Sequence, residues 1–480
     1  MTVDFARLAA ALRGRVVLPD DPEYVWVRRR NIRLDRDLLP AAIAKCASAE
    51  DVAEALAYAR AYGMPFAVRA GGHSYADHSS TEGLLIDVGG LDSVEFEPAD
   101  GAREGAPVRV GAGTRIGPLT ERLAQAGRLL PTGTCPTVGI AGSALVGGFG
   151  LVGRAYGLTL DRIRAVRLVL ADGRLVTADP TNHPDLYWAL RGAGAGNFGV
   201  ATEFVFDTVP IPELTAVGAV WPLRDAVAVV AGWQEYAPDS PDALSGSLAL
   251  LATSQLHHPP SVHFFGAVAA APDVAARLVD EFFDALGPPP RRSVAQVLPA
   301  QVAARYQAGL VDLYGNETYQ PVGPFERPGY QFTRSGFFAR PLPRQAIAEL
   351  VARLEADRDF VEHRELEFAP WQGAYARVPA GETAFAHRSA RHLVRITVAV
   401  GSSATPYRLD AARRWLDRAW ATIGSFSSGG VYPGYADPDL TGWARAYYGD
   451  GLSRLRRIKS RYDPDNLFSF PQSVPPADAG

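Results

Sequence analysis

The spacing of apolar residues over residues 1–208 predicts short helices and strands in alternation. Apolar residues recur at helical spacing between Ser48, which suits the N-cap of a helix, and Gly63, which suits a helix end. The run PFAVRA (65–70) predicts a short buried strand. Residues 163–179 predict a β-hairpin that turns at an Asp-Gly pair. This mixture of elements indicates an α+β fold class.

The pattern changes over residues 209–424, which are rich in proline, alanine and loop signals. The runs HRELEFAPW (363–371) and RHLVRITVAVG (391–401) predict strands, and RQAIAELVARLEAD (344–357) predicts a helix with one apolar stripe. Such a stripe is most simply explained by core packing under a sheet. The region therefore predicts an antiparallel sheet with helices on one face.

The bulk composition is that of a soluble globular protein. The chain has 480 residues, of which 47% are hydrophobic and 21% charged. Its net charge of −4 gives no reason to expect nucleic acid or an anionic membrane as a partner. No apolar run approaches the roughly 20 residues that a transmembrane helix needs. Because the N-terminal segment contains Asp4 and lacks an uninterrupted apolar core, we expect no signal peptide and a cytoplasmic, bacterial protein.

Two glycine-rich segments each contain one nucleophilic side chain. RAGGHSY (69–75) contains His73, and GTCPTVGIAGSALVGGFG (133–150) contains Cys135, one of only two cysteines. Glycine leaves room for a bound group, and backbone N–H groups in such loops can bind phosphate oxygens. Either nucleophile alone is more simply explained as structural, because most such residues are inert. Together the two segments suggest a site where a ligand approaches the backbone.

Two other kinds of site are disfavoured. The stretch GAGNFG (194–199) matches the G-x-G-x-x-G pattern of dinucleotide-binding proteins, in which the motif follows a strand and opens a helix. Here a predicted helix precedes the motif and a predicted strand follows it, which argues against an NAD site. His257, His258 and His263 have no recognised ligand spacing, so we expect no metal site.

The glycine-rich segments belong to an ordered series of motifs that resembles the berberine bridge enzyme group. The series continues with RAYGLTLDRI (154–163), HPDLYWALRGAGAGNFGV (183–200) and the closing segment 432–474. That group belongs to the FAD-binding vanillyl-alcohol oxidase/p-cresol methylhydroxylase (PCMH) superfamily. The resemblance is dense in the first and last parts of the chain and thin between them.

The resemblance implies a two-domain, PCMH-type FAD-binding fold. Residues 1–208 would form most of the FAD-binding domain, and residues 425–480 would return to complete it. Residues 209–424 would form the substrate domain, an antiparallel sheet covered by helices whose bare face looks toward the flavin.

The resemblance also implies that FAD is bound covalently at two points. His73 would bond to the 8α-methyl carbon of the flavin, and Cys135 to ring carbon C6. Both attacks need a free lone pair, on a neutral imidazole and on a thiolate, and the ordinary pKa values of about 6.5 and about 8.5 allow both forms near neutral pH. The small Val138 matches a position that governs oxygen access, which favours an oxidase. The residues that match FAD-contacting positions are Arg69, Ala70, Gly71, Gly72, Ser74, Tyr75, Val138, Gly139, Gly142, Ser143, Gly148, Asn197, Val200 and Asn466.

Tyr435 matches the tyrosine that accepts a proton from the substrate hydroxyl in this family. An ordinary phenol has a pKa near 10, so either a neighbour lowers it or the proton leaves in concert with hydride transfer. Strand alternation places Glu367 on a face that relatives present to the substrate, which makes it a second catalytic candidate, although a solvated carboxylate is the simpler explanation of this residue. Trp371 and Tyr432 are expected to form a stacking wall for the substrate.

We therefore interpret the chain as a bicovalently flavinylated oxidase of a small molecule. Hydride would pass to flavin N5 from an alcohol on a sugar or a bulky natural product, and dioxygen would be reduced to hydrogen peroxide. The alternatives are oxidation at a C–N or benzylic carbon, an FAD-linked dehydrogenase with another acceptor, and a flavin-loaded binding protein with little turnover. The sequence determines neither the substrate nor the oligomeric state.

Overall fold

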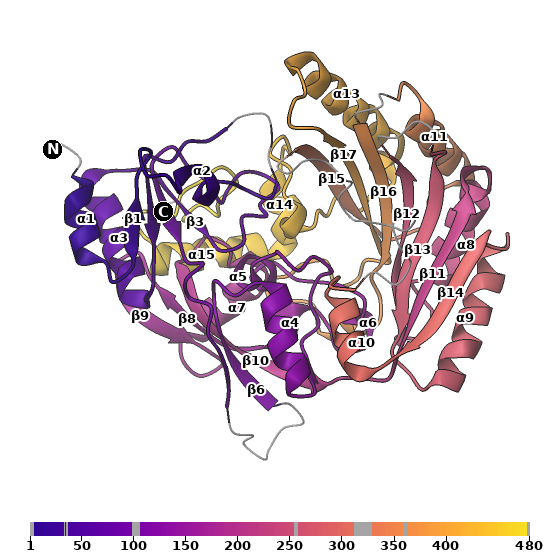
Figure 1. The fold of residues 1–480 in the computed structure, drawn as a ribbon, viewed down its shortest axis with the longest axis horizontal. Coiled ribbons are helices and arrows are strands. Elements are labelled where there is room, and N and C mark those ends of the chain that lie inside the picture. Colours follow the sequence, from indigo (N-terminus) through magenta and orange to yellow (C-terminus); the bar gives the residue numbers. More distant parts are fainter. Residues whose placement is uncertain are drawn as a thin grey trace.

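The chain folds into two lobes that face each other (Figure 1). One lobe combines the N-terminal part of the chain with its C-terminal segment, and the other is a large sheet backed by helices. The computed structural model describes residues 4–32, 34, 37–97, 106–253, 258–311, 329–358 and 362–477.

The first sheet is small and mostly parallel. In spatial order its strands are β1 (Arg15–Val17), β2 (Ala42–Lys45), β4 (Leu84–Asp87) and β3 (Phe66–Arg69). Helix α3 (Ala49–Tyr62) connects β2 to β3, and it is capped by Ser48, whose hydroxyl accepts the N–H of Asp51. The helix ends at Gly63, which has a left-handed φ of 58° that costs glycine little. The predicted helix and strand are confirmed, and β3 leads directly into the first glycine-rich segment.

The second sheet is antiparallel and contains the predicted hairpin. Its strands run in the order β5 (Val94–Phe96), β6 (Ala106–Gly111), β10 (Val200–Pro210), β8 (Ile163–Val169) and β9 (Leu175–Ala178), and β7 (Arg128–Leu129) pairs with the end of β10. The β8–β9 hairpin turns at Gly173, which has a φ of 86°. The GAGNFG stretch lies between α7 (Pro184–Ala193) and β10, in the helix-before-strand order that the sequence predicts. Helix α5 (Ile140–Ala144) lies within the second glycine-rich segment, and helices α4 (Ile116–Gln125) and α6 (Gly153–Tyr156) precede and follow it.

The third sheet is antiparallel throughout and has seven strands. In spatial order they are β14 (Arg292–Leu298), β11 (Leu214–Pro222), β13 (Ser261–Val268), β12 (Leu244–Ala252), β16 (Glu362–Pro370), β17 (His392–Val400) and β15 (Tyr330–Phe338). Four helices cover one face of the sheet, namely α8 (Ala226–Tyr236), α9 (Pro272–Leu286), α11 (Arg344–Glu355) and α13 (Pro406–Ile423) (Figure 1). The predicted antiparallel sheet with helices on one face is confirmed. A further helix, α10 (Ala300–Gln307), packs against α4 of the other lobe.

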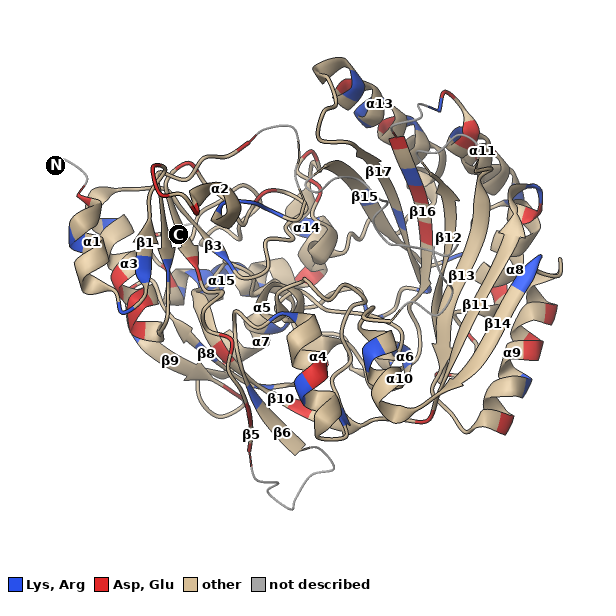
Figure 2. Cartoon of the chain, viewed as in Figure 1, with Lys and Arg blue, Asp and Glu red and all other residues tan. Residues whose placement is uncertain are grey.

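The two faces of the third sheet differ in chemistry because side chains alternate along each strand. On the helix side, residues such as Leu366, Phe368, Val394 and Ile396 belong to one apolar core. The opposite face carries Glu365 and Glu367 of β16 and Arg395 of β17, and Figure 2 shows charged positions along this part of the sheet. The apolar face stabilises the lobe, and the polar face is available for chemistry.

The C-terminal segment packs back onto the first lobe through α14 (Trp443–Tyr448) and α15 (Leu452–Tyr462). Lys459 of α15 is fully buried and forms a 2.7 Å ion pair with Asp463. Its ammonium also donates to the carbonyl oxygens of Asn197 and Phe468, at 2.7 and 2.8 Å. A buried charge needs such partners because leaving it unpaired in a low-dielectric interior is costly.

The predicted domain boundaries fall within secondary structure. The boundary at 208/209 lies in β10, and the boundary at 424/425 lies in a short 3₁₀ helix (Gly424–Phe426). Both boundaries remain predictions. No helix in the described part of the chain is long and apolar enough to cross a membrane.

Candidate active site

A cavity of about 870 Å³ lies where the two glycine-rich segments face the polar side of the third sheet. This volume is within the usual range for a cofactor or ligand site, about 300–1,000 Å³. Most of the predicted site residues line it: Ala70, Gly71, Gly72, His73, Ser74, Tyr75, Cys135, Val138, Gly139, Gly142, Ser143, Gly148, Val200, Glu367, Tyr432 and Tyr435. Tertiary folding therefore brings residues from both glycine-rich segments and from β16 to one space.

The two glycine-rich segments touch backbone to backbone. A Cβ atom built on Gly71 would lie 2.2 Å from the backbone nitrogen of Gly139, and one built on Gly139 would lie 2.5 Å from the nitrogen of Gly71. Asn31 holds the first segment in place, since its backbone N–H donates to the carbonyl of Gly72 and its side-chain amide to the carbonyl of Gly71, at 2.9 and 2.8 Å. Only residues without a side chain allow this approach.

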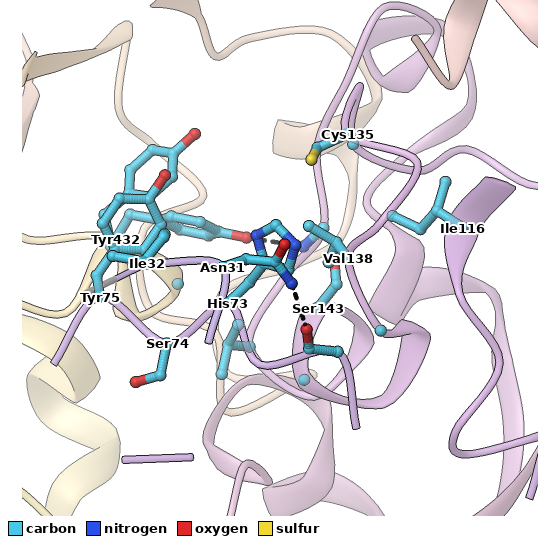
Figure 3. A pocket seen from close by; sticks show the side chains of 18 of the residues that line it. Asn31, Ile32, His73, Ser74, Tyr75, Ile116, Cys135, Val138, Ser143 and Tyr432 are labelled. Atoms are coloured by element: carbon cyan, nitrogen blue, oxygen red, sulfur yellow. Dashed lines mark hydrogen bonds between the residues drawn. The ribbon is translucent and has the colours of Figure 1, made fainter. Parts of the chain in front are cut away.

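His73 and Cys135 both reach the cavity, as Figure 3 shows, with His73 beside Asn31 and Val138. The Nε2 atom of His73 lies 3.0 Å from the hydroxyl oxygen of Thr137, and the Sγ atom of Cys135 lies 3.5 Å from the same oxygen. Two nucleophiles from distant parts of the chain are thus linked through one hydroxyl group.

The other cysteine is unsuited to chemistry. Cys46 is buried, and burial raises the pKa of its thiol well above the ordinary value, with a further increase from the carboxylates of Asp51 and Asp87. The thiolate is the reactive form of cysteine. Of the two free thiols, only that of Cys135 lines the cavity.

The lining fits FAD by size and by chemistry. Its glycine and alanine positions leave backbone groups open to a ligand, and a Cβ on Gly142 would meet no atom within 4 Å. Ser74 and Ser143 add hydroxyl groups that can bind phosphate oxygens. His78 is half-buried in the same lining, and desolvation lowers its pKa to about 4, which keeps the imidazole neutral. A nucleotide cofactor therefore meets small, uncharged groups along this wall.

Four predicted site residues do not line the cavity. Arg69 turns away, because its buried guanidinium donates to the carbonyl oxygens of Val27 and Ser79, at 2.9 and 3.0 Å. The Asn197 side-chain amide is likewise occupied by backbone groups, donating to the carbonyl of Ala193 and accepting the N–H of Val474.

The other two are Asn466 and Trp371. Asn466 has a left-handed backbone, with a φ of 52°, and its buried Oδ1 has no hydrogen-bond partner among the described residues. Trp371 is fully buried and packs against Phe149 and Tyr375, with ring centroids 5.2 and 4.9 Å away. Trp371 therefore belongs to the aromatic core, and its expected stacking role remains a prediction.

Tyr435 stands at the centre of an aromatic group in the cavity wall. Its ring centroid is 5.1 Å from those of both Tyr75 and Tyr432, in edge-to-face arrangements. The hydroxyl of Tyr432 accepts the backbone N–H of Gly148 at 2.8 Å, so this tyrosine holds the second glycine-rich segment as well as forming the wall. Burial raises the pKa of Tyr435 well above its ordinary value.

Arg395 on β17 opposes the effect of burial on the pKa of Tyr435, and the sequence alone does not point to this arginine. Its guanidinium carbon lies 4.9 Å from the ring centroid of Tyr435, and its positive charge lowers the pKa of this phenol against the larger effect of burial. Nearly all basic residues of this chain are arginine, so no local signal distinguishes Arg395. A cross-strand alignment with β16, which pairs Glu367 with Arg395, would have found it.

Glu367 is an ion-pair partner rather than an unpaired base. One carboxylate oxygen of Glu367 lies 2.6 Å from Arg395, and Glu365 forms a second ion pair with the same guanidinium. Burial raises the pKa of Glu367, while Arg395 and a hydrogen bond from Ser247 lower it. Together the two carboxylates hold Arg395 beside the ring of Tyr435.

Further polar residues of the third sheet line the cavity and were also missed. They come from β12, β13 and β15, and they are Ser245, Ser247, His263 and Gln331. Burial lowers the pKa of His263 to about 4, so its imidazole is neutral. Among the described residues, no group of histidine, cysteine or acidic side chains could hold a metal ion, and His257 lies outside those residues.

Comparisons with known proteins agree with this site. The family model described as "FAD binding domain" matches residues 40–179, and the model "Berberine and berberine like" matches residues 431–475. The FAD-linked oxidoreductase YgaK of Bacillus subtilis is 32% identical, over 97% of both chains. The xylooligosaccharide oxidase of Thermothelomyces thermophilus is 30% identical, over 92% of this chain and 88% of the relative. The solved structure of Physcomitrella patens BBE-like 1 superposes with a TM-score of 0.84 at 28% identity, covering 98% of this chain and 99% of that one.

We expect Gly71→Ala to destabilise the fold by about 1–3 kcal/mol, the usual cost of forcing extra atoms into packed space. The new methyl group would collide with the backbone of Gly139. The thermal unfolding midpoint measures the effect. Gly401→Ala is the control, because a Cβ there meets no atom within 4 Å. Equal midpoints for the two variants would contradict the described packing.

Proposed function

Because this chain belongs to the berberine bridge enzyme-like family of FAD-linked oxidoreductases, we propose that it is an oxidase with FAD attached at both His73 and Cys135. Its substrate is an alcohol on a sugar or a bulky natural product. When bound, FAD accepts a hydride at N5 and transfers two electrons to dioxygen, which leaves as hydrogen peroxide. The observation that carries the assignment of alcohol oxidation is the contact between the guanidinium of Arg395 and the ring of Tyr435.

Two-point attachment is supported by the position of the nucleophiles. His73 and Cys135 line one cavity, and both lie within hydrogen-bonding distance of Thr137. The alternative thiol, Cys46, is buried and carries a raised pKa. Covalent anchors hold a cofactor without full enclosure, which leaves space in the cavity for a large substrate.

Tyr435 accepts the proton of the substrate hydroxyl as the hydride departs. Burial raises the pKa of this phenol, and only its ionised form can accept the proton. The guanidinium of Arg395 lies against the ring and stabilises the phenolate form. A nearby opposite charge favours the ionised form of a titrating group, so the contact offsets part of the effect of burial.

The polar face of the third sheet supports a hydroxyl-rich substrate. Ser245, Ser247, His263 and Gln331 present donors and acceptors to the cavity, beside the ion pairs of Arg395. The relative from Thermothelomyces is named as an oxidase of xylooligosaccharides, and we propose a related substrate class for this chain. The small side chain of Val138 at the cavity supports reaction with dioxygen rather than another acceptor.

A second candidate is oxidation at the C–N bond of a cationic amine. One observation favours it, namely that Glu365 and Glu367 place two carboxylates around a single guanidinium. The formal charge of this cluster is negative and attracts a cation. An amine has no hydroxyl proton for Tyr435 to accept, so this tyrosine is less important for the oxidation of such a substrate.

Acid denaturation followed by ultrafiltration tests the attachment. We expect the wild-type protein to retain its yellow colour, His73→Ala and Cys135→Ala each to retain it through the remaining bond, and the double variant to lose it. Cys46→Ala is the matched control and should behave as wild type, because Cys46 does not line the cavity. Release of flavin from the wild-type chain would refute two-point attachment.

Substitution of the tyrosine separates the two candidate reactions. We expect Tyr435→Phe to reduce the rate of anaerobic flavin reduction by an alcohol about 10²–10⁴-fold, the usual contribution of a general base, and to affect an amine far less. Tyr407→Phe, at an exposed position on α13, is the control. Hydrogen peroxide should accompany turnover in air. If the substrate reduces the flavin but only an artificial acceptor, and not dioxygen, reoxidises it, the enzyme is a dehydrogenase.

Loss of Arg395 should change the pH dependence of flavin reduction. Because Arg395 lowers the pKa of Tyr435, Arg395→Gln should raise that pKa and move the rising limb of the rate profile to higher pH. An upward shift of about 1–3 pH units is expected, because an opposite charge close to an ionisable group typically lowers its pKa by about that much. Arg395→Lys should move the limb less, and Arg391→Gln, which removes an exposed ion pair with Asp239, should not move it. An unshifted limb in Arg395→Gln would show that Tyr435 is not the titrating base.

A further inference from the structure

One hydroxyl group connects the two predicted attachment residues. The Thr137 oxygen lies 3.0 Å from Nε2 of His73 and 3.5 Å from Sγ of Cys135. We propose that Thr137 positions and activates both side chains for covalent attachment of the flavin. This inference rests on the proposed two-point attachment and assigns a role to a residue that forms no part of the predicted site.

The backbone around Thr137 is held firmly. The carbonyl oxygens of its two neighbours, Pro136 and Val138, accept the N–H groups of Gly117 and Ile116 at the start of α4, at 2.8 and 2.9 Å. Gly139, which follows Val138 in the chain, packs against the segment that contains His73. The hydroxyl of Thr137 is therefore presented to His73 by fixed structure on both sides.

The hydrogen-bonding capacity of a hydroxyl explains how one residue serves two nucleophiles. A neutral imidazole has one N–H group and one nitrogen with a free lone pair. When Nε2–H of His73 donates to the Thr137 oxygen, Nδ1 keeps the lone pair that forms the new bond. The hydrogen of Thr137 is then available to Sγ of Cys135, where it stabilises the reactive thiolate. A single directed chain of hydrogen bonds thus prepares both side chains.

The overall chemistry balances with dioxygen as the oxidant. Each attachment forms one N–C or S–C bond, and it breaks one C–H bond of the flavin and the N–H or S–H bond of the protein nucleophile. Each attachment therefore releases two protons and two electrons, which one molecule of dioxygen takes up as hydrogen peroxide, so the two attachments consume two molecules of dioxygen. Thr137 accepts the hydrogen bond from the nitrogen that loses the proton of His73, so it lies on the route by which that proton leaves.

The test counts flavin bonds rather than catalytic turnovers. Wild type, Thr137→Val and Thr137→Ser are incubated in air with excess FAD, then denatured in acid at intervals. Intact mass gives the number of bound flavins, and peptide mapping assigns each bond to His73 or Cys135. We expect Thr137→Val to attach flavin at least about tenfold more slowly at both residues, because the valine is of similar size but lacks the hydroxyl. Thr137→Ser restores the hydroxyl and should recover most of the wild-type rate.

Thr114→Val is the matched control. The Thr114 side chain is buried nearby, its carbonyl accepts the N–H of Ile140, and its hydroxyl has no hydrogen-bond partner among the residues described. Removing that hydroxyl should leave the attachment rate unchanged. If Thr137→Val does not fold, the attachment rate of Thr137→Ala is compared with that of Thr137→Ser instead.

The possible results separate the two proposals. Wild-type attachment rates in Thr137→Val would overturn the role of Thr137 and leave the proposed function intact. Equal loss in Thr137→Val and Thr137→Ser would also overturn it, because the hydroxyl would then not be the group responsible. Absence of two-point attachment in the wild-type protein itself would refute the proposed function first, and this inference with it.

Discussion

The close approach of the backbones at Gly71 and Gly139 is the contact on which the rest of the site depends. Two segments that are distant in the chain meet there with no side chain between them. This contact sets the distance between His73 and the loop that contains Thr137 and Cys135. Any larger residue at either glycine would push the segments apart and separate the two nucleophiles.

A second constraint is the balance between burial and charge at Tyr435. A buried phenol resists ionisation, and an unpaired buried guanidinium would be costly as well. The protein places both groups together and surrounds Arg395 with Glu365 and Glu367. Each group reduces the cost of burying its neighbour, and the register of β16 against β17 provides the geometry.

The cavity also depends on how the two lobes are joined. Arg388 of the sheet lobe forms a buried ion pair with Asp161 of the other lobe, at 2.6 Å. Arg154 of α6 donates to the carbonyl oxygens of Pro238, Ser240 and Leu244, at distances of 2.7–3.0 Å. Buried guanidinium groups with several partners form rigid connections. The polar face of the sheet is thereby held over the glycine-rich segments.

By itself, the sequence determined the local elements and indicated two candidate nucleophiles. Apolar periodicity and capping residues predict α3 and the third sheet correctly, because these signals are local, and ordered motifs identify His73 and Cys135. Only the tertiary structure decided which side chains face the cavity. It turned Arg69 toward backbone carbonyls and buried Trp371 against Phe149.

The tertiary structure also brought Arg395 against Tyr435, and it placed Thr137 between His73 and Cys135. The physical reason is that the direction and partners of a side chain depend on neighbours that are distant in sequence. Periodicity along one strand or helix does not contain that information.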